Sequence, residues 1–184
     1  MGHWFESSTS YQICYKYFFM LIFNNVCDSN LLDMLHQDYE SQLKEPVLLT
    51  SKNWDENLKI GIDGLVKVFP VNDSISKLIR KILVKKVHNT RLYNMNFVYQ
   101  VMPYQAGISK HCDDTHHFAA TLYLNKVWDI NYGGIFIYED NLTLKAHCPT
   151  YNTLIVNDNK ALHLVTPVTK AATTARVTLQ CFGA

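Results

Sequence analysis

The sequence predicts a mainly β domain, a sandwich or barrel supported on one side by α-helices. After residue 94, seven short β-rich runs follow one another, at 96–102, 118–124, 135–138, 142–145, 153–156, 162–165 and 176–182. Before residue 94, hydrophobic residues recur instead at helical spacing. The 184 residues are 48% hydrophobic and 18% charged, which favours one compact domain over residues 1–184. Residues 1–93 would supply a supporting strand and helices, and residues 94–184 the β core.

The apolar run at 17–23 is expected to be a buried strand. It is shorter than the ~20 apolar residues that a membrane span requires. It also lacks a small-residue cleavage site after it, which argues against a secretory signal peptide. We therefore expect neither a membrane anchor nor export.

Two segments have hydrophobic residues at the spacing of an amphipathic helix. Asp28 or Ser29 can cap the first, whose apolar positions are Leu31, Leu32, Leu35 and Tyr39. We expect Asp73 to cap the second, whose apolar positions are Ile75, Leu78, Ile79, Ile82, Leu83 and Val87. The basic residues of this second segment are interpreted as its solvated face. The intervening stretch 48–70 is expected to be irregular.

Composition excludes several classes of function. The chain has 17 Lys and Arg against 16 Asp and Glu, so a nucleic-acid-binding surface is not expected. Its five cysteines are scattered and form no CxxC pair, which indicates free thiols in a reducing compartment. We therefore predict a cytoplasmic protein, with no nucleic-acid or membrane partner.

The residues that point to chemistry are His111, Asp113 and His163. In a strand, residues i and i+2 face the same side, so His111 and Asp113 would lie side by side. A second imidazole from an opposing strand, His163, would complete three ligands on one side of a metal ion. Two histidines and one carboxylate that leave other positions open form the facial triad of non-haem Fe(II) oxygenases.

A second group consists of Arg176, Thr178 and Tyr123. A guanidinium matches a carboxylate with two parallel hydrogen bonds, and a neighbouring hydroxyl can add another. Arg176 and Thr178 would share one strand face and could hold the far carboxylate of 2-oxoglutarate, which the phenol of Tyr123 could also reach. Taken singly, each of these residues has an ordinary structural explanation. Their order and their setting in successive strands favour a site.

Three segments carry a resemblance to a known family: 107–113, 121–128 followed by Gly133 and Gly134, and 163–168 with 176–178. Together they resemble the prolyl-4-hydroxylase-like branch of the Fe(II)/2-oxoglutarate-dependent dioxygenases. The resemblance covers about half of the chain, from residue 94 onward. The run Tyr-Leu-Asn, Trp and Gly-Gly at 123–134 is its most specific part, because ligand chemistry alone does not demand it.

The resemblance implies a double-stranded β-helix, a cupin-like jelly roll. It makes His111, Asp113 and His163 the iron ligands and Arg176 the clamp on 2-oxoglutarate, with Thr178 and Tyr123 as auxiliary contacts. No catalytic residue beyond the metal ligands is implied. The cosubstrates would be 2-oxoglutarate and O2, with ascorbate as a supporting reductant, and the products succinate, CO2 and an oxidised substrate. The acid at Asp113 favours hydroxylation, or another oxidation such as desaturation or ring closure, over halogenation, because iron halogenases of similar fold carry Gly or Ala there.

Two departures from the family leave alternatives open. The interval from His163 to Arg176 is longer than is usual in the family, so Lys170 could be the clamp, although the alternating strand around Arg176 favours Arg176. Asp114, His116 and His117 crowd the ligand segment and are interpreted as loop residues without an assigned role.

Three functions remain possible at this stage. The enzyme could hydroxylate a prolyl residue of a peptide, or oxidise a free amino acid or another small metabolite. The small size of the chain slightly favours the second. The third possibility is a non-catalytic or other-metal cupin-like binding module. The loops 105–110 and 130–132 and parts of 48–70 are expected to set the choice of substrate.

Overall fold

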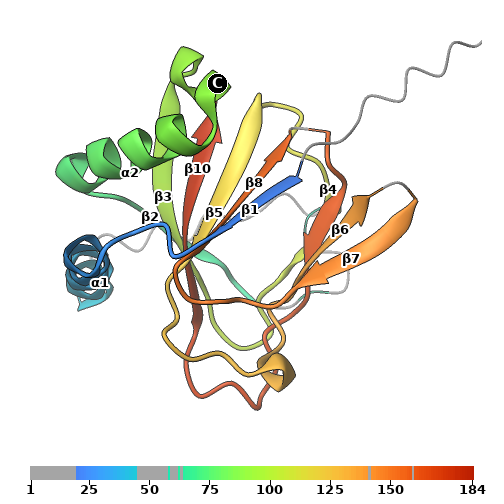
Figure 1. Ribbon diagram of the computed structural model, residues 1–184. Helices are drawn as coiled ribbons and strands as arrows, with labels where there is room; N and C mark the ends of the chain where they lie inside the picture. Colours follow the sequence, from blue (N-terminus) through green and yellow to red (C-terminus); the bar gives the residue numbers. More distant parts are fainter. Residues whose placement is uncertain (1–19, 45–57, 59–61, 63, 141, 159) are drawn as a thin grey trace, which may run out of the picture.

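In the computed structural model, which describes residues 20–44, 58, 62, 64–140, 142–158 and 160–184, two antiparallel sheets pack against each other. The helices of the described chain, α1 (Ser29–Lys44) and α2 (Asp73–Lys86), lie on the outer side of the larger sheet, and the smaller sheet lies on its other side (Figure 1). This arrangement confirms the predicted mainly β fold with supporting helices.

Among the described residues, the larger sheet has the strand order β1 (Met20–Asn24), β8 (Thr153–Asp158), β5 (Phe118–Tyr123), β10 (Arg176–Gly183), β3 (Met95–Met102) and β2 (Lys67–Pro70). The smaller sheet has the order β4 (Ile108–His111), β9 (His163–Val165), β6 (Phe136–Asp140) and β7 (Thr143–His147). The described residues also form the 3-10 turns η2 (His88–Leu92) and η3 (Ile130–Tyr132). All seven predicted β runs form strands, with ends shifted by no more than two residues.

The central strand β10 joins the two halves of the fold because it is buried on both faces. Its outward residues Val177, Leu179 and Cys181 belong to a hydrophobic core that includes Leu35 of α1 and Ile79 of α2. This core holds the helices against the sheet, and the burial of its apolar side chains is the main term that stabilises them there.

The other face of β10 is polar. Arg176, Thr178 and Gln180 alternate with the outward residues and therefore point toward the smaller sheet, although all three are buried. Thr178 lies opposite Tyr123 of β5 on one side and Gln100 of β3 on the other. Buried polar side chains require partners, so this inner face is where a ligand site is expected.

The helix caps agree with the predictions in one case and differ in the other. Asp28 caps α1, because its carboxylate accepts a hydrogen bond from the Leu31 amide at 2.9 Å. The prediction of Asp73 as the second cap is wrong by one residue. The side chain of Asn72 accepts from the Ser74 amide at 2.9 Å, and Asp73 is the first helical residue. There its carboxylate lies near the positive end of the helix dipole.

Other boundaries also differ from expectation. Of the stretch 48–70 that was predicted to be irregular, residues 48–57, 59–61 and 63 lie outside the described residues, whereas 67–70 form the edge strand β2 against β3. Strand β4 was not among the predicted runs. Asn157 and Asp158 belong to an Asn-Asp-Asn run that is typical of a turn, yet both residues extend β8. Of the apolar run 17–23, residues 20–23 belong to β1 and the rest lie outside the described residues. The expectation of a buried strand is wrong for the described part, because β1 is an edge strand and Ile22 is 40% exposed.

Neither described helix combines the length and apolar character that crossing a membrane demands. The four described cysteines, Cys27, Cys112, Cys148 and Cys181, are free thiols as expected, and Cys14 lies outside the described residues.

Leu35→Ala should test the helix-to-sheet core. The Leu35 side chain is 0% exposed, so its truncation leaves a cavity and should lower the free energy of unfolding by about 2–5 kcal/mol. Leu43→Ala, on the same helix at 37% exposure, is the matched control and should cost less than about 1 kcal/mol. Urea unfolding of the two variants measures the difference. Equal losses would show that α1 is not anchored through this core.

Candidate metal centre and the cavity around it

Three predicted residues, His111, Asp113 and His163, meet at one end of the smaller sheet. His111 is the last residue of β4 and lies opposite His163, the first residue of β9, with their ring centres 4.3 Å apart. The expectation that Asp113 shares a strand face with His111 is wrong, because β4 ends at His111. Asp113 lies in the loop that follows, and this loop carries the carboxylate back toward both imidazoles.

The distances place the three side chains around one point. The Nε2 atom of His111 is 3.8 Å from Oδ1 of Asp113, and Nε2 of His163 is 3.6 Å from Oδ2 of the same carboxylate. One donor atom from each of the three residues lies within 4.8 Å of the other two. A single small cation between them would therefore be within reach of all three.

Backbone hydrogen bonds fix which nitrogen of each ring faces the carboxylate. Nδ1 of His111 is 2.8 Å from the Ser109 carbonyl oxygen, and Nδ1 of His163 is 2.8 Å from the Ala161 carbonyl oxygen. A carbonyl only accepts, so each Nδ1 carries a proton, and the Nε2 atom of each ring faces Asp113. Burial lowers the pKa of His163, against the opposing effect of Asp113, and so favours the neutral ring. These donors fit the Fe(II) that the resemblance implies.

Asn157 supports the carboxylate from outside the triad. Its amide nitrogen donates to Oδ2 of Asp113 at 3.3 Å from strand β8. Such an outer hydrogen bond fixes the orientation of a metal-binding carboxylate. Sequence reasoning missed this role because Asn157 begins an Asn-Asp-Asn cluster that is typical of a turn.

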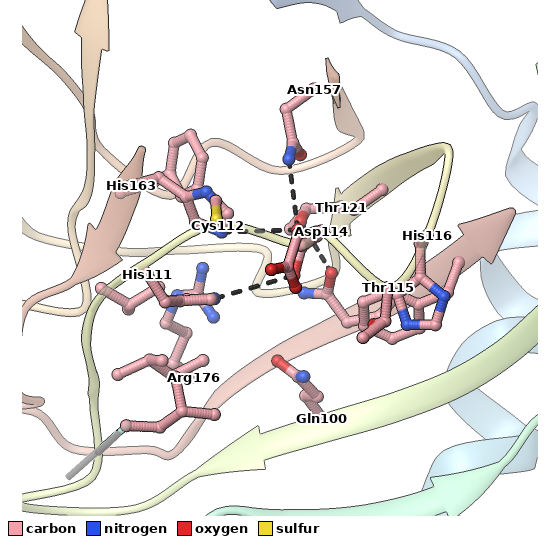
Figure 2. Close-up of a pocket in the computed structure, with 18 residues that line it drawn as sticks. Gln100, His111, Cys112, Asp114, Thr115, His116, Thr121, Asn157, His163 and Arg176 are labelled. Carbon is pink, nitrogen blue, oxygen red and sulfur yellow. Dashed lines mark hydrogen bonds and ion pairs between the residues drawn. The ribbon is translucent and has the colours of Figure 1, made fainter. Parts of the chain in front are cut away.

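The triad borders a cavity of about 410 Å³ between the two sheets. Figure 2 shows His163 and Asn157 at the top of the view and Gln100 at the bottom, with His111 and Arg176 on the left between them. Arg176, Gln100 and Asn157 come from the larger sheet, and His111 and His163 come from the smaller one. The remaining lining residues are Leu58, Ile108, Cys112, Asp113, Asp114, Thr115, His116, Ala119, Thr121, Phe136, Val165, Gln180 and Phe182. The cavity thus has the metal-binding donors at one wall and a cation at the other.

Arg176 is a buried cation without an anionic partner among the described residues. It is 1% exposed, and its Nη1 atom donates a hydrogen bond to the Met102 sulfur at 3.5 Å. Its Nε atom is buried without a hydrogen-bond partner in the described part of the chain, and burial lowers the pKa of the guanidinium. A buried unpaired charge costs several kcal/mol, so the site is built to receive an anion.

The two auxiliary residues lie beside Arg176, behind the cavity wall. The guanidinium carbon is 5.1 Å from the centre of the Tyr123 ring, whose hydroxyl is buried and has no partner among the described residues. Burial raises the pKa of Tyr123, so the phenol stays protonated and able to donate. Thr178 is fully buried, and its oxygen accepts from Gln180 at 3.0 Å, which leaves its hydroxyl proton free to donate. The alternative clamp, Lys170, is exposed and does not border this cavity.

The glycine pair of the specific motif has a packing explanation. Gly134 has a φ of +62°, and a Cβ there would lie 2.7 Å from Cδ of Arg176 and 3.3 Å from the Trp128 ring. The Trp128 indole in turn donates to the Gly133 carbonyl at 2.9 Å. The Trp and Gly-Gly run therefore forms the channel in which the Arg176 side chain lies.

Several cavity residues had no predicted role. Gln100, Thr121 and Gln180 sit on the inner face of the larger sheet, where polar residues in a strand would ordinarily indicate a solvent-facing side. Asp114 and His116, interpreted from the sequence as loop residues, also border the cavity. His117 does not border it and stacks on Tyr93 instead, with ring centres 4.5 Å apart.

Comparison with known proteins identifies the architecture. The sequence matches no protein-family model and no curated protein sequence. Among solved structures, a prolyl-4-hydroxylase from Pseudomonas putida is similar, with a TM-score of 0.71 at 15% identity over 89% of this chain and 91% of that one. A prolyl hydroxylase from Trichoplax adhaerens, in complex with a hypoxia-inducible-factor peptide fragment, has a TM-score of 0.67 at 17% identity, covering 89% and 82%.

A third similar structure is an oxidoreductase of the 2OG-Fe(II) oxygenase family from Burkholderia pseudomallei. Its TM-score is 0.59 at 18% identity, covering 91% of this chain and 85% of that one. At these identities the likeness establishes the fold, and it confirms the predicted resemblance at that level. The chain has the jelly-roll fold of prolyl hydroxylases and other 2OG-Fe(II) oxygenases.

Proposed function

We propose that this protein is an Fe(II)- and 2-oxoglutarate-dependent dioxygenase that hydroxylates an unactivated C–H bond and releases succinate and CO2. The observation that carries the proposal is one cavity with a His-Asp-His donor set on one wall and a buried, unpaired guanidinium on the other. A dicarboxylate that chelates a metal at one end and needs a cation at the other matches this pair of features.

The chain's own residues have distinct parts in this proposal. His111, Asp113 and His163 hold the iron, which when bound supplies the oxygen-activating redox chemistry. The Nδ1 hydrogen bonds keep both imidazoles turned toward the metal, and Asn157 keeps the carboxylate in place. Three protein donors leave coordination positions for a chelating cosubstrate and O2.

Arg176 holds the far carboxylate of 2-oxoglutarate. Its planar guanidinium can donate two parallel hydrogen bonds, and the free protons of Thr178 and Tyr123 can add to them. Phe136 packs against His163, with ring centres 5.2 Å apart, and helps to keep water from the reacting end of the cavity. Ascorbate would serve as a supporting reductant.

Asp113→Ala tests the ligand assignment. Loss of the single carboxylate of the triad should weaken divalent-metal binding by more than ~100-fold and abolish hydroxylation, since it removes a ligand and not an outer partner. Asp33→Ala, an exposed carboxylate on α1, is the control and should leave metal affinity unchanged. Asn157→Leu should have an intermediate effect and weaken metal binding about 10-fold, because Asn157 orients the carboxylate without binding the metal itself.

Metal binding in these variants can be followed by isothermal titration with Fe(II) under anaerobic conditions. Full metal affinity in Asp113→Ala would contradict the ligand assignment.

Arg176→Met tests whether Arg176 binds 2-oxoglutarate, and it separates the effect on cosubstrate binding from the effect on stability. The substitution removes a buried unpaired charge, so without ligand the free energy of unfolding should stay equal or rise. The concentration of 2-oxoglutarate needed for half-maximal succinate formation should rise at least ~30-fold, because a buried charged pair contributes about 2 kcal/mol or more. Lys170→Met is the matched control and should change neither quantity. A larger effect from Lys170→Met would mean that the clamp is wrongly assigned.

A screen for iron- and 2-oxoglutarate-dependent succinate formation tests the function as a whole. Proline-containing peptides form one arm, because the Trichoplax adhaerens neighbour holds a peptide, and free amino acids form the other. Stimulation by either arm supports the proposal. Iron-loaded protein that forms no succinate with any substrate, and that binds no 2-oxoglutarate, would contradict it.

A further inference from the structure

The cavity keeps polar groups that the proposed metal and cosubstrate sites do not use. Gln100 of β3, Thr121 of β5 and Gln180 of β10 all lie on the inner face of the larger sheet and border the cavity. They are at least nine-tenths buried. Burial of polar groups is unfavourable unless they are hydrogen-bonded, so each of these side chains needs a partner in the protein or in a ligand.

Two of these three residues satisfy each other within the protein. The Thr121 hydroxyl donates to Oε1 of Gln180 at 2.8 Å, and Nε2 of Gln180 donates to the Thr178 hydroxyl at 3.0 Å. This chain of bonds fixes the orientation of the Gln180 amide. The Gln180 amide therefore keeps the Thr178 hydroxyl in place, and its own oxygen and nitrogen both already take part in hydrogen bonds.

Gln100 is different, because its amide has no partner within the described chain. The side chain is 4% exposed and lies opposite Thr178 across the β3–β10 pair. Figure 2 shows the Gln100 amide directed from β3 into the cavity, on the side opposite the triad. A buried primary amide offers a donor and an acceptor on one edge, and both are open to whatever enters this space.

The charges around the cavity limit what that ligand can be. Asp113 and Asp114 are the lining carboxylates, and Arg176 is the lining cation among the described residues. With Arg176 committed to 2-oxoglutarate, the acidic groups Asp113 and Asp114 remain in the lining, and these repel a substrate anion. A neutral polar group is therefore favoured.

We propose, on the basis of the proposed function, that the primary substrate presents a carboxamide group to Gln100, and that Gln100 is a specificity-determining residue. Two primary amides can pair edge to edge, each donating one N–H and accepting at one oxygen. A trans peptide unit cannot do so, because its N–H and C=O point in opposite directions. A prolyl ring has neither a donor nor an acceptor in its ring carbons and would leave Gln100 buried and unpaired.

The carboxamide could belong to a free amino acid or to a glutamine side chain in a peptide. The test uses wild-type protein loaded with Zn(II) and 2-oxoglutarate, because binding can then be measured by titration calorimetry without turnover. The probes are L-glutamine, L-norleucine, the tripeptide Gly-Gln-Gly and the tripeptide Gly-Pro-Gly. We expect L-glutamine to bind at least about tenfold more tightly than L-norleucine, or Gly-Gln-Gly at least about tenfold more tightly than Gly-Pro-Gly. Whichever glutamine probe binds more tightly shows whether the carboxamide belongs to a free amino acid or to a peptide side chain.

The variant Gln100→Leu keeps the approximate volume and removes the amide. It should weaken carboxamide binding at least about tenfold and leave 2-oxoglutarate affinity within about twofold. Gln37→Leu, on exposed surface of α1, is the matched control and should change neither.

Tighter binding of Gly-Pro-Gly than of both glutamine probes would overturn the inference. So would a loss in Gln100→Leu that falls on 2-oxoglutarate instead of the carboxamide, or the absence of carboxamide binding by wild-type protein that binds 2-oxoglutarate. Failure of the proposed function would have a different signature, since metal-loaded wild-type protein would then not bind 2-oxoglutarate at all.

Discussion

The burial of Arg176 without a counter-charge in the described chain is the constraint around which the rest of the site is arranged. A guanidinium at the centre of a sheet must be shielded from water, supported along its stem and left one open side for an anion. The glycine at position 134 gives room for the stem, the Tyr123 ring lies against the charged head, and the cavity provides the open side. The helices stabilise this arrangement from behind, because they pack on the outward residues of the same strand.

The two faces of β10 show how stability and function are divided within one strand. Its outward residues contribute to a continuous hydrophobic core, whereas its inward residues are polar and incompletely satisfied by the protein. Such groups lower the stability of the empty protein and become favourable when a ligand pairs with them. The metal-binding end follows the same principle. Two imidazoles and one carboxylate are held in place by backbone and amide hydrogen bonds.

Sequence patterns were sufficient for the strands after residue 94 except β4, and they named the three residues that the structure brings together. Alternating β-rich runs located strands to within two residues, because burial of one or both faces constrains the residue types strongly. The Trp and Gly-Gly motif also marked the site, although its physical reason, room for Arg176, became visible only in three dimensions. Tyr123 and Thr178 were expected beside the clamp and do lie beside it, yet they stand behind the cavity wall.

The remainder depended on long-range geometry that local patterns do not contain. Asp113 reaches the histidines from a loop, and Asn157 reaches Asp113 from a strand end whose sequence is typical of a turn. Gln100 is buried, although glutamine is typical of a surface. The N-cap of α2 was predicted one residue too late. Asn and Asp are about equally favourable as N-caps, so the sequence alone does not decide between Asn72 and Asp73.

The most direct measurement of the central claim is the visible absorption of the Fe(II)-loaded protein, titrated with 2-oxoglutarate in the absence of oxygen. Chelation of the iron by a keto acid that Arg176 holds in the cavity should produce a weak charge-transfer band that saturates with a single equivalent. Protein that has bound iron but develops no such band would contradict the account.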